Sequence, residues 1–176
     1  MRGLIWAAGA IAAAVVACGE PATVASDEGG SVSITWDGQY RGHLEAPATA
    51  TWCAVDSMLQ VLAIKEDTAV GFALYVPDTL HVGQHPVLSP QIKVDWRPLA
   101  AAAMRWLSPT EVVGFEGVSG VVSVTAVDST GVSGTFDIGY RVPAGSDTIR
   151  ANGSFDRLVV TPARGSCGRA NKGKGG

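Results

Sequence analysis

The amino-acid sequence predicts an all-β domain, an antiparallel β-sandwich or barrel-like fold made of many short strands. Runs in which apolar and polar residues alternate recur along the chain, as expected for strands with one face in a core and the other in solvent. These runs are separated by turn-forming residues, and the chain contains 22 glycines and 9 prolines. With 176 residues, the chain can bury the core of one domain but is too short for two ordinary ones.

The composition excludes two broad classes of protein. Hydrophobic residues make up 47% of the chain and charged residues only 16%, which is too apolar for a disordered protein. The formal net charge is −3 and the isoelectric point is near 5.5. A nucleic-acid binder needs a concentrated basic face that displaces counterions, so we expect no nucleic-acid partner.

The first residues have the layout of an export signal. Arg2 provides a short positive region, residues 4–16 form an uncharged apolar run, and the small residue Ala17 precedes Cys18. A membrane span needs about 20 apolar residues, and Glu20 interrupts the run before that length. The run also lacks the polar face of a helix that packs on a core.

The stretch "VVAC" at Val15 to Cys18 resembles the lipobox of bacterial lipoproteins. That resemblance implies a signal peptide over residues 1–17, cleavage before Cys18, a diacylglyceryl thioether on its sulfur, and often a further acyl chain such as palmitate on the new amine. Two or three chains anchor a protein durably. The alternative is an ordinary signal peptide with a chance cysteine.

The resemblance also implies a location in the cell envelope. In bacteria with two membranes, an aspartate after the acylated cysteine tends to retain a lipoprotein in the inner membrane, and this chain has Gly19. The outer membrane is therefore favoured if the organism has one. Residues 18–30 are small, polar and unpatterned after the cysteine, which predicts a flexible tether.

The β domain is predicted to span residues 31–163. Val32, Ile34 and Trp36 alternate with polar residues, and an Asp-Gly pair follows them, which together predict a first hairpin. Further strand-like runs follow at 52–55, 59–64 and 70–76. In the last of these runs, alternate residues should share a core-facing side: Val70, Phe72, Leu74 and Val76.

The middle of the chain is less regular. Residues 77–109 contain five of the nine prolines, so this stretch is not expected to be a central strand throughout. The stretch "RPLAAAAMRWL" predicts a short helix near residues 98–107, with Pro98 at the first helical position. Long irregular insertions on a rigid scaffold often carry binding surfaces.

The C-terminal half repeats a short motif. "GVSG" occurs at residues 117–120 and again at 131–134, each time before an alternating run, which predicts two turns of an antiparallel meander. A last strand is expected over 155–161 with Phe155 and Val159 on one face. The tail, residues 164–176, is basic and glycine-rich. It is either a solvated end or a weak contact for an anionic surface through Arg164, Arg169, Lys172 and Lys174.

The chain has three cysteines. If Cys18 carries lipid, Cys53 and Cys167 remain as a pair, and an oxidising envelope permits a disulfide between them. Two unpaired thiols are the alternative. Neither cysteine has a second cysteine or histidine at the spacing of a zinc site.

No catalytic or metal-binding motif is recognisable. His81 and His85 stand four residues apart with Asp78 and Asp95 nearby, but Gly83 and Pro86 oppose the helix that gives such pairs their geometry. Both histidines are therefore expected to be exposed loop residues. The chain lacks the G-x-S-x-G elbow of serine hydrolases. We therefore predict no catalytic residues, no metal and no cofactor. A paired-carboxylate site would have to be chosen from an unremarkable list: Glu111, Glu116, Asp128, Asp137 and Asp156.

One aromatic and cationic set is a candidate contact for a ligand: Trp96, Arg97, Arg105 and Trp106. Tryptophan and arginine are enriched at binding hot spots, although core packing and ion pairing are the alternative roles. The sequence thus predicts a membrane-anchored envelope lipoprotein, a non-catalytic binding or structural module whose partner is another envelope protein or a glycan. The alternative is an envelope hydrolase with an unrecognised active site.

Overall fold

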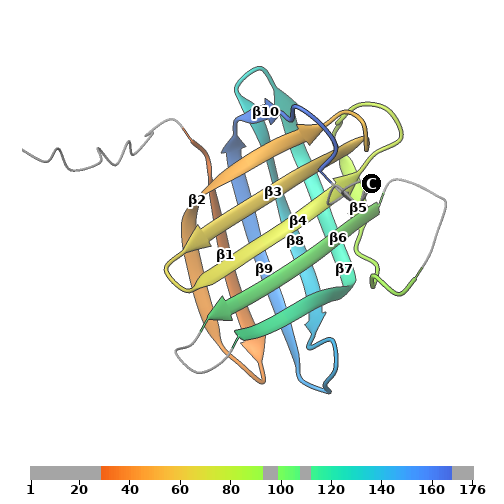
Figure 1. The fold of residues 1–176 in the computed structure, drawn as a ribbon. Helices are drawn as coiled ribbons and strands as arrows, with labels where there is room; N and C mark the ends of the chain where they lie inside the picture. Colours follow the sequence, from red (N-terminus) through yellow and green to blue (C-terminus); the bar gives the residue numbers. More distant parts are fainter. Residues whose placement is uncertain (1–28, 93–98, 108–111, 168–176) are drawn as a thin grey trace, which may run out of the picture.

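The computed structural model describes residues 29–92, 99–107 and 112–167, and the elements it contains there are β-strands (Figure 1). Within these residues, none forms a helix with the length and apolar character needed to cross a membrane. The strands are β1 (Ser31–Gly38), β2 (Gly42–Cys53), β3 (Met58–Lys65), β4 (Thr68–Tyr75), β5 (Gly83–Pro86), β6 (Leu99–Leu107), β7 (Val112–Asp128), β8 (Gly131–Arg141), β9 (Thr148–Leu158) and β10 (Val160–Pro162).

Eight strands form a closed antiparallel barrel. The sheet runs in the order β1-β9-β8-β7-β6-β4-β3-β2, and β1 also pairs with β2, so the ring has no open edge. Val32 marks the closure, because it lies opposite Ala46 of β2 and Phe155 of β9. The predicted all-β class is therefore confirmed, and the form is a barrel rather than a two-sheet sandwich.

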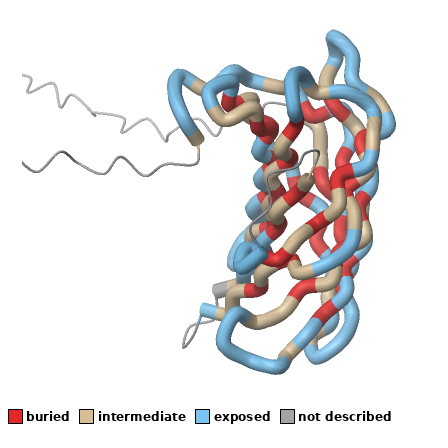
Figure 2. Tube along the Cα trace, turned by 90° about the vertical axis from the view of Figure 1, so that its right-hand side faces the viewer, coloured by how far each residue is buried: buried red, intermediate tan, exposed pale blue. Residues whose placement is uncertain are grey.

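The predicted alternation on β4 is confirmed and places its apolar face in the core. Val70, Phe72 and Leu74 are at most 4% exposed. The Phe72 ring lies 5.7 Å from that of Phe136 and 5.3 Å from that of Phe155, measured between ring centroids. Figure 2 shows buried positions alternating with less buried ones along the strands. These three rings fill the barrel interior, as the side chains of an eight-stranded barrel can.

Two glycines make room for these rings. A Cβ at Gly153 would stand 2.6 Å from Cζ of Phe136, and one at Gly134 would collide with the Phe155 ring. Both glycines lie on strands next to the strand that carries the ring. Each ring therefore packs directly over the backbone of the neighbouring strand.

A second aromatic cluster lies beside the hairpin that joins β1 and β2. The Tyr40 ring meets Trp106 at 4.9 Å and Phe115 at 5.8 Å, both edge to face, and Trp106 and Phe115 are 5.1 Å apart. Such pairs add specific stabilisation beyond the area they bury. The predicted Asp-Gly pair still belongs to β1, which ends at Gly38. The turn therefore begins one residue after that pair.

The two "GVSG" segments have different structures. The second, at 131–134, begins β8 after a tight turn, as predicted, but the first, at 117–120, lies inside β7 as a bulge. There Gly120 takes φ of 108° and the register with β8 shifts. The prediction of two turns is therefore half wrong. The bulge separates the part of β7 that pairs with β6 from the part that pairs with β5.

The predicted helix near residues 98–107 is also wrong. Residues 99–107 form β6, which pairs with β4 along its length and with the first part of β7. Ala100, Ala102 and Met104 face the core, at 0%, 8% and 1% exposure. The backbone hydrogen bonds that β6 makes with β4 and β7 outweigh the helical preference of the alanines.

The last long strand changes face near its end. Phe155 is buried as predicted, but Val159 is 51% exposed and Leu158 takes the buried place. The cause is Arg157, whose φ of 48° interrupts the alternation. The prediction that Phe155 and Val159 share a face is therefore wrong.

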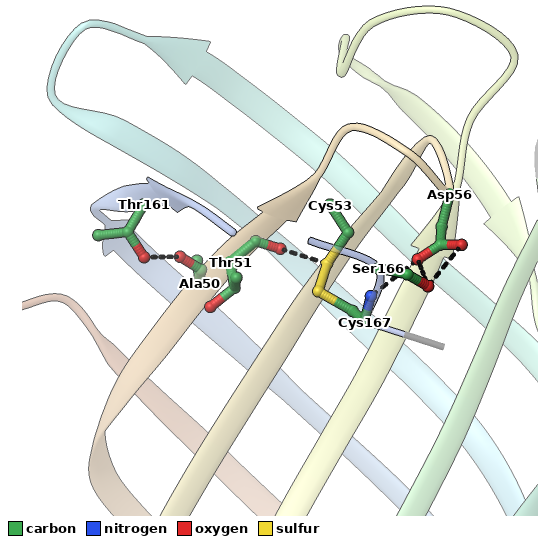
Figure 3. Close-up of a disulfide and its surroundings, with 7 residues drawn as sticks. All are labelled: Ala50, Thr51, Cys53, Asp56, Thr161, Ser166 and Cys167. Atoms are coloured by element: carbon green, nitrogen blue, oxygen red, sulfur yellow. Dashed lines mark hydrogen bonds between the residues drawn. A yellow bond between two sulfur atoms is a disulfide. The ribbon is translucent and has the colours of Figure 1, made fainter. Parts of the chain in front are cut away.

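A disulfide joins Cys53 at the end of β2 to Cys167, with 5.9 Å between the two Cα atoms, as the cysteine count predicted (Figure 3). The chain before Cys167 runs along β2, where β10 pairs in parallel and the Thr161 hydroxyl donates to the Ala50 carbonyl at 3.2 Å. The Ser166 hydroxyl and the Cys167 amide both donate to the Asp56 carboxylate, each at 2.8 Å. The C-terminal segment is thus fastened to one end of the barrel.

Candidate binding groove

A groove of about 650 Å³ runs over the outside of the barrel, across β3, β4, β6 and β7. Its lining is mostly apolar, and its volume lies within the range of small-molecule and cofactor sites. Leu62 of β3, 39% exposed, stands on one side. Pro90 and Pro143 lie among the lining residues contributed by loops. The barrel interior, in contrast, holds its own side chains.

The groove exists because the outward positions of β4 and β6 are small. Ala101 and Ala103 alternate with the inward alanines of β6, and Gly71 lies opposite Ala103 on β4. A Cβ at Gly114 of β7 would find no atom within 4 Å. Four small residues, two alanines and two glycines on three adjacent strands, leave a hollow where larger side chains would have covered the sheet.

A polar network lies along the β7 side of the groove. The Glu116 carboxylate, only 14% exposed, accepts hydrogen bonds from Gln91 Nε2 at 2.9 Å and Arg141 Nη2 at 3.0 Å. These two donors, the Gln91 amide first, hold the pKa of Glu116 below its ordinary value. Ser89 in turn donates to the Gln91 carbonyl oxygen. Glu116 is therefore fixed as an ionised, oriented carboxylate at the edge of an apolar surface.

The structure separates the four predicted ligand-contact residues. Trp96 and Arg97 lie outside the described residues. Arg105 points outward and lines the groove, whereas Trp106, its neighbour on β6, packs against Tyr40 and Phe115. Successive residues of a strand face opposite sides, so Arg105 and Trp106 do not form one stacking platform. The groove-floor alanines were not predicted as site residues.

The two loop histidines have different environments. His81 is exposed and its Nδ1 lies 2.8 Å from the Thr79 carbonyl oxygen. His85 is 1% exposed on β5, and neither of its ring nitrogens has a hydrogen-bond partner. Asp95 lies outside the described residues, and the part of the chain that the structure covers has no group of three metal-ligating side chains. The prediction that both histidines would be exposed is wrong for His85.

Burial gives His85 a testable pH dependence. Desolvation, and secondarily the charge of His81, lowers the pKa of His85 from its ordinary 6.5. In the unfolded chain the ring takes up its proton near pH 6.5. Below that pH the unfolded state binds more protons than the folded state, so the free energy of unfolding decreases as the pH is lowered. We expect the melting temperature to fall as the pH is lowered from about 7.5 to about 5.5. His85→Phe should flatten this slope in scanning calorimetry, and an equally steep slope in that variant would contradict the assignment to His85.

Three further acids named in the sequence analysis, besides Glu116, are engaged with local partners. Asp137 bonds to Arg150 through both carboxylate oxygens, at 2.8 and 2.7 Å, and this lowers its pKa. Asp156 pairs with Arg157 at 3.1 Å, and Asp128 accepts hydrogen bonds from Thr130. Glu111 lies outside the described residues. The carboxylates of these three aspartates are therefore occupied by residues near them on the barrel surface.

Comparison with known proteins gives no relative from which to transfer a role. No family model, no curated protein and no solved structure matches this chain. The groove and its residues therefore have to be interpreted from their own chemistry.

Proposed function

We propose that this protein is a lipoprotein of the bacterial cell envelope, anchored through Cys18, whose barrel is a non-catalytic binding module. The lipobox-like residues 15–18 and the apolar run before them support the anchor. The disulfide supports an oxidising compartment, because such bonds persist outside the cytosol. The binding surface is the outer groove between β3 and β7.

The observation that carries the binding role is an apolar hollow on the outside of a barrel whose inside is filled. The floor at Ala101, Ala103 and Gly114 presents little side chain, so an extended apolar segment could approach the sheet closely. Arg105 and the Glu116–Arg141 pair are charged groups that would fix its register. Because Trp106 faces inward, the described groove lacks its ring as a sugar-stacking platform, and we favour another envelope protein as the partner over a glycan.

The alternative, an envelope hydrolase, would pair His81 or His85 with an acid in a cleft. His85 is enclosed without a partner, and the contact described for His81 is a backbone carbonyl. No specific observation favours this alternative.

One experiment in cells tests both parts of the proposal. A photo-crosslinking residue replaces Ala103 in the full-length chain, with Thr35 as the matched control, because Thr35 is exposed on β1, across the ring from β6. We expect a discrete crosslinked partner from position 103 and not from position 35. Gly114→Trp, whose Cβ would meet no atom within 4 Å and whose ring would fill the groove, should abolish that product.

The same cells, fed a clickable fatty acid, report on the anchor. The wild-type chain should be labelled and Cys18→Ser should not. Equal labelling of the two would refute the anchor, and identical crosslinks from positions 103 and 35 would refute the groove.

A further inference from the structure

We propose that the end of the barrel that carries the disulfide lies against the bilayer, and that exposed valines there enter the boundary between lipid headgroups and acyl chains. We call this surface the disulfide end; it comprises residues 54–57, 76–82, 127–131 and 159–167. The proposal rests on the lipid anchor proposed above. It adds the orientation of the domain and a second, protein-borne contact with the membrane.

Four exposed valines mark the disulfide end. Val55 is 75% exposed, Val82 58%, Val159 51% and Val127 38%. They come from four separate connections: the turn after β2, the loop before β5, the tip of the β7–β8 hairpin and the link from β9 to β10. Figure 1 shows these connections at the same end of the barrel, around β10. Isolated exposed valines are ordinary, but half of the large exposed hydrophobic side chains of the described chain gather here.

A hollow at this end extends the apolar surface. It has a volume of about 350 Å³ and is lined by Trp52, Leu80, Val127, Val159 and Val160, together with the Thr130 turn. Trp52 is only partly buried against the core. An aromatic ring with aliphatic neighbours at the end of a domain is suited to the interfacial region of a bilayer, where tryptophan is enriched.

The tether begins at this same end. Gly30 packs against the backbone of Asp156 and Arg157, and its carbonyl accepts from the Ala48 amide at 3.0 Å, so the chain enters the barrel beside the start of β10. A random-coil chain with as many residues as separate Cys18 from Gly30 would have a root-mean-square span of about 19 Å. The 11 residues of β9, tilted as barrel strands are, span roughly 28 Å along the barrel axis. The anchored sulfur therefore stays nearer the disulfide end than the opposite end.

The charges at and beside the disulfide end do not supply the attraction. Asp56 accepts from Ser166 and Cys167, Asp128 from Thr130, and Asp156 pairs with Arg157. Asp78 adds a fourth carboxylate, and Arg164 an exposed cation. The four carboxylates outnumber the two arginines, Arg157 and Arg164, so anionic lipid would not attract this end, and the contact with the bilayer is apolar. A weak contact suffices, because the anchor already keeps the domain at high effective concentration beside the membrane.

Depth quenching in vesicles tests the orientation. With Cys18 acylated and Cys53 bonded to Cys167, an introduced cysteine is the sole reactive thiol among the cysteines of the mature chain. Ser129→Cys, in the β7–β8 turn, and Gln39→Cys, in the β1–β2 turn at the opposite end, each receive a fluorophore. The purified lipidated protein is inserted into phosphatidylcholine vesicles that contain a nitroxide-headgroup lipid. We expect loss of most of the fluorescence at position 129 and retention at position 39.

Matched serine variants test the valines. In the Ser129→Cys background, Val55→Ser with Val159→Ser should restore the fluorescence, whereas Ile64→Ser with Val112→Ser, which removes exposed side chains toward the other end, should leave it quenched. An unchanged melting temperature shows that each variant is folded. Quenching at position 39, no quenching at 129, or equal effects of the two serine pairs overturns the orientation while the protein still floats with vesicles. Failure to float, with a bare Cys18 sulfur by mass spectrometry, overturns the anchor and the orientation together.

Discussion

Replacing Cys53 and Cys167 with serine should lower the free energy of unfolding by about 4 to 5 kcal/mol. The disulfide joins residues separated by 114 positions, so it closes almost the whole domain into one loop and removes a large amount of entropy from the unfolded chain. In the folded state, β10 pairs with β2, the Ala163 amide donates to the Trp52 carbonyl at 2.8 Å, and Asp56 accepts from the Cys167 amide. Urea unfolding followed by tryptophan fluorescence measures the change.

Two comparisons isolate the crosslink as the cause. Reduced wild-type protein should unfold at the same lower urea concentration as the double serine variant, and Cys18→Ser should match the oxidised wild type, because Cys18 precedes the barrel. Equal urea midpoints for oxidised and reduced protein would mean that the unfolded chain gains no conformational entropy when the disulfide is broken. That result would contradict the entropic account.

The strands with a clear alternation were predictable because their pattern encodes one buried face. β4 shows this best: each of its inward side chains belongs to the core that the sequence predicted. Closure into a barrel was not predictable, since it depends on β1 pairing with β9 as well as with β2. The pairing of β1 with β9 joins residues from opposite ends of the domain, and the alternation pattern does not identify the partner strand.

The helix prediction failed at an alanine run, and the same run explains why the groove was missed. Alanine favours a helix when isolated, but here it fills a central strand between β4 and β7. Ala101 and Ala103 form the groove floor together with Gly71, which lies opposite Ala103 on β4, and Gly114, which lies opposite Arg105 on β7. In a sequence, a single small residue does not indicate that small residues of other strands will lie next to it. Trp106, chosen as a binding residue for its type, faces Tyr40 instead.

Local backbone conformation limited the prediction near the end of β9. The apolar pattern at Phe155 and Val159 fits an unbroken strand, and only the positive φ of Arg157 shifts the register. Arginine gives no sequence signal for that conformation. The consequence is functional in our proposal, because the shift is what exposes Val159 at the disulfide end.

Phe72→Ala should destabilise the barrel by about 3 to 5 kcal/mol. Phe72 is 4% exposed and its ring contacts those of Phe136 and Phe155, so truncation removes apolar burial and leaves a cavity between two rings that cannot both move into it. Neither ring can sink further, since each already lies over a glycine of the neighbouring strand. Thermal and urea unfolding measure the loss.

Leu62→Ala is the matched control, because Leu62 stands on the next strand but faces outward and is 39% exposed. It should cost less than about 1 kcal/mol. Phe72→Ala with Phe136→Ala should cost less than the sum of the single changes, since the rings share one contact. If Phe72→Ala were as mild as the control, the interior would be loosely filled and able to admit a guest. The binding site would then have to be sought inside the barrel, so this stability measurement also decides between the interior and the outer groove.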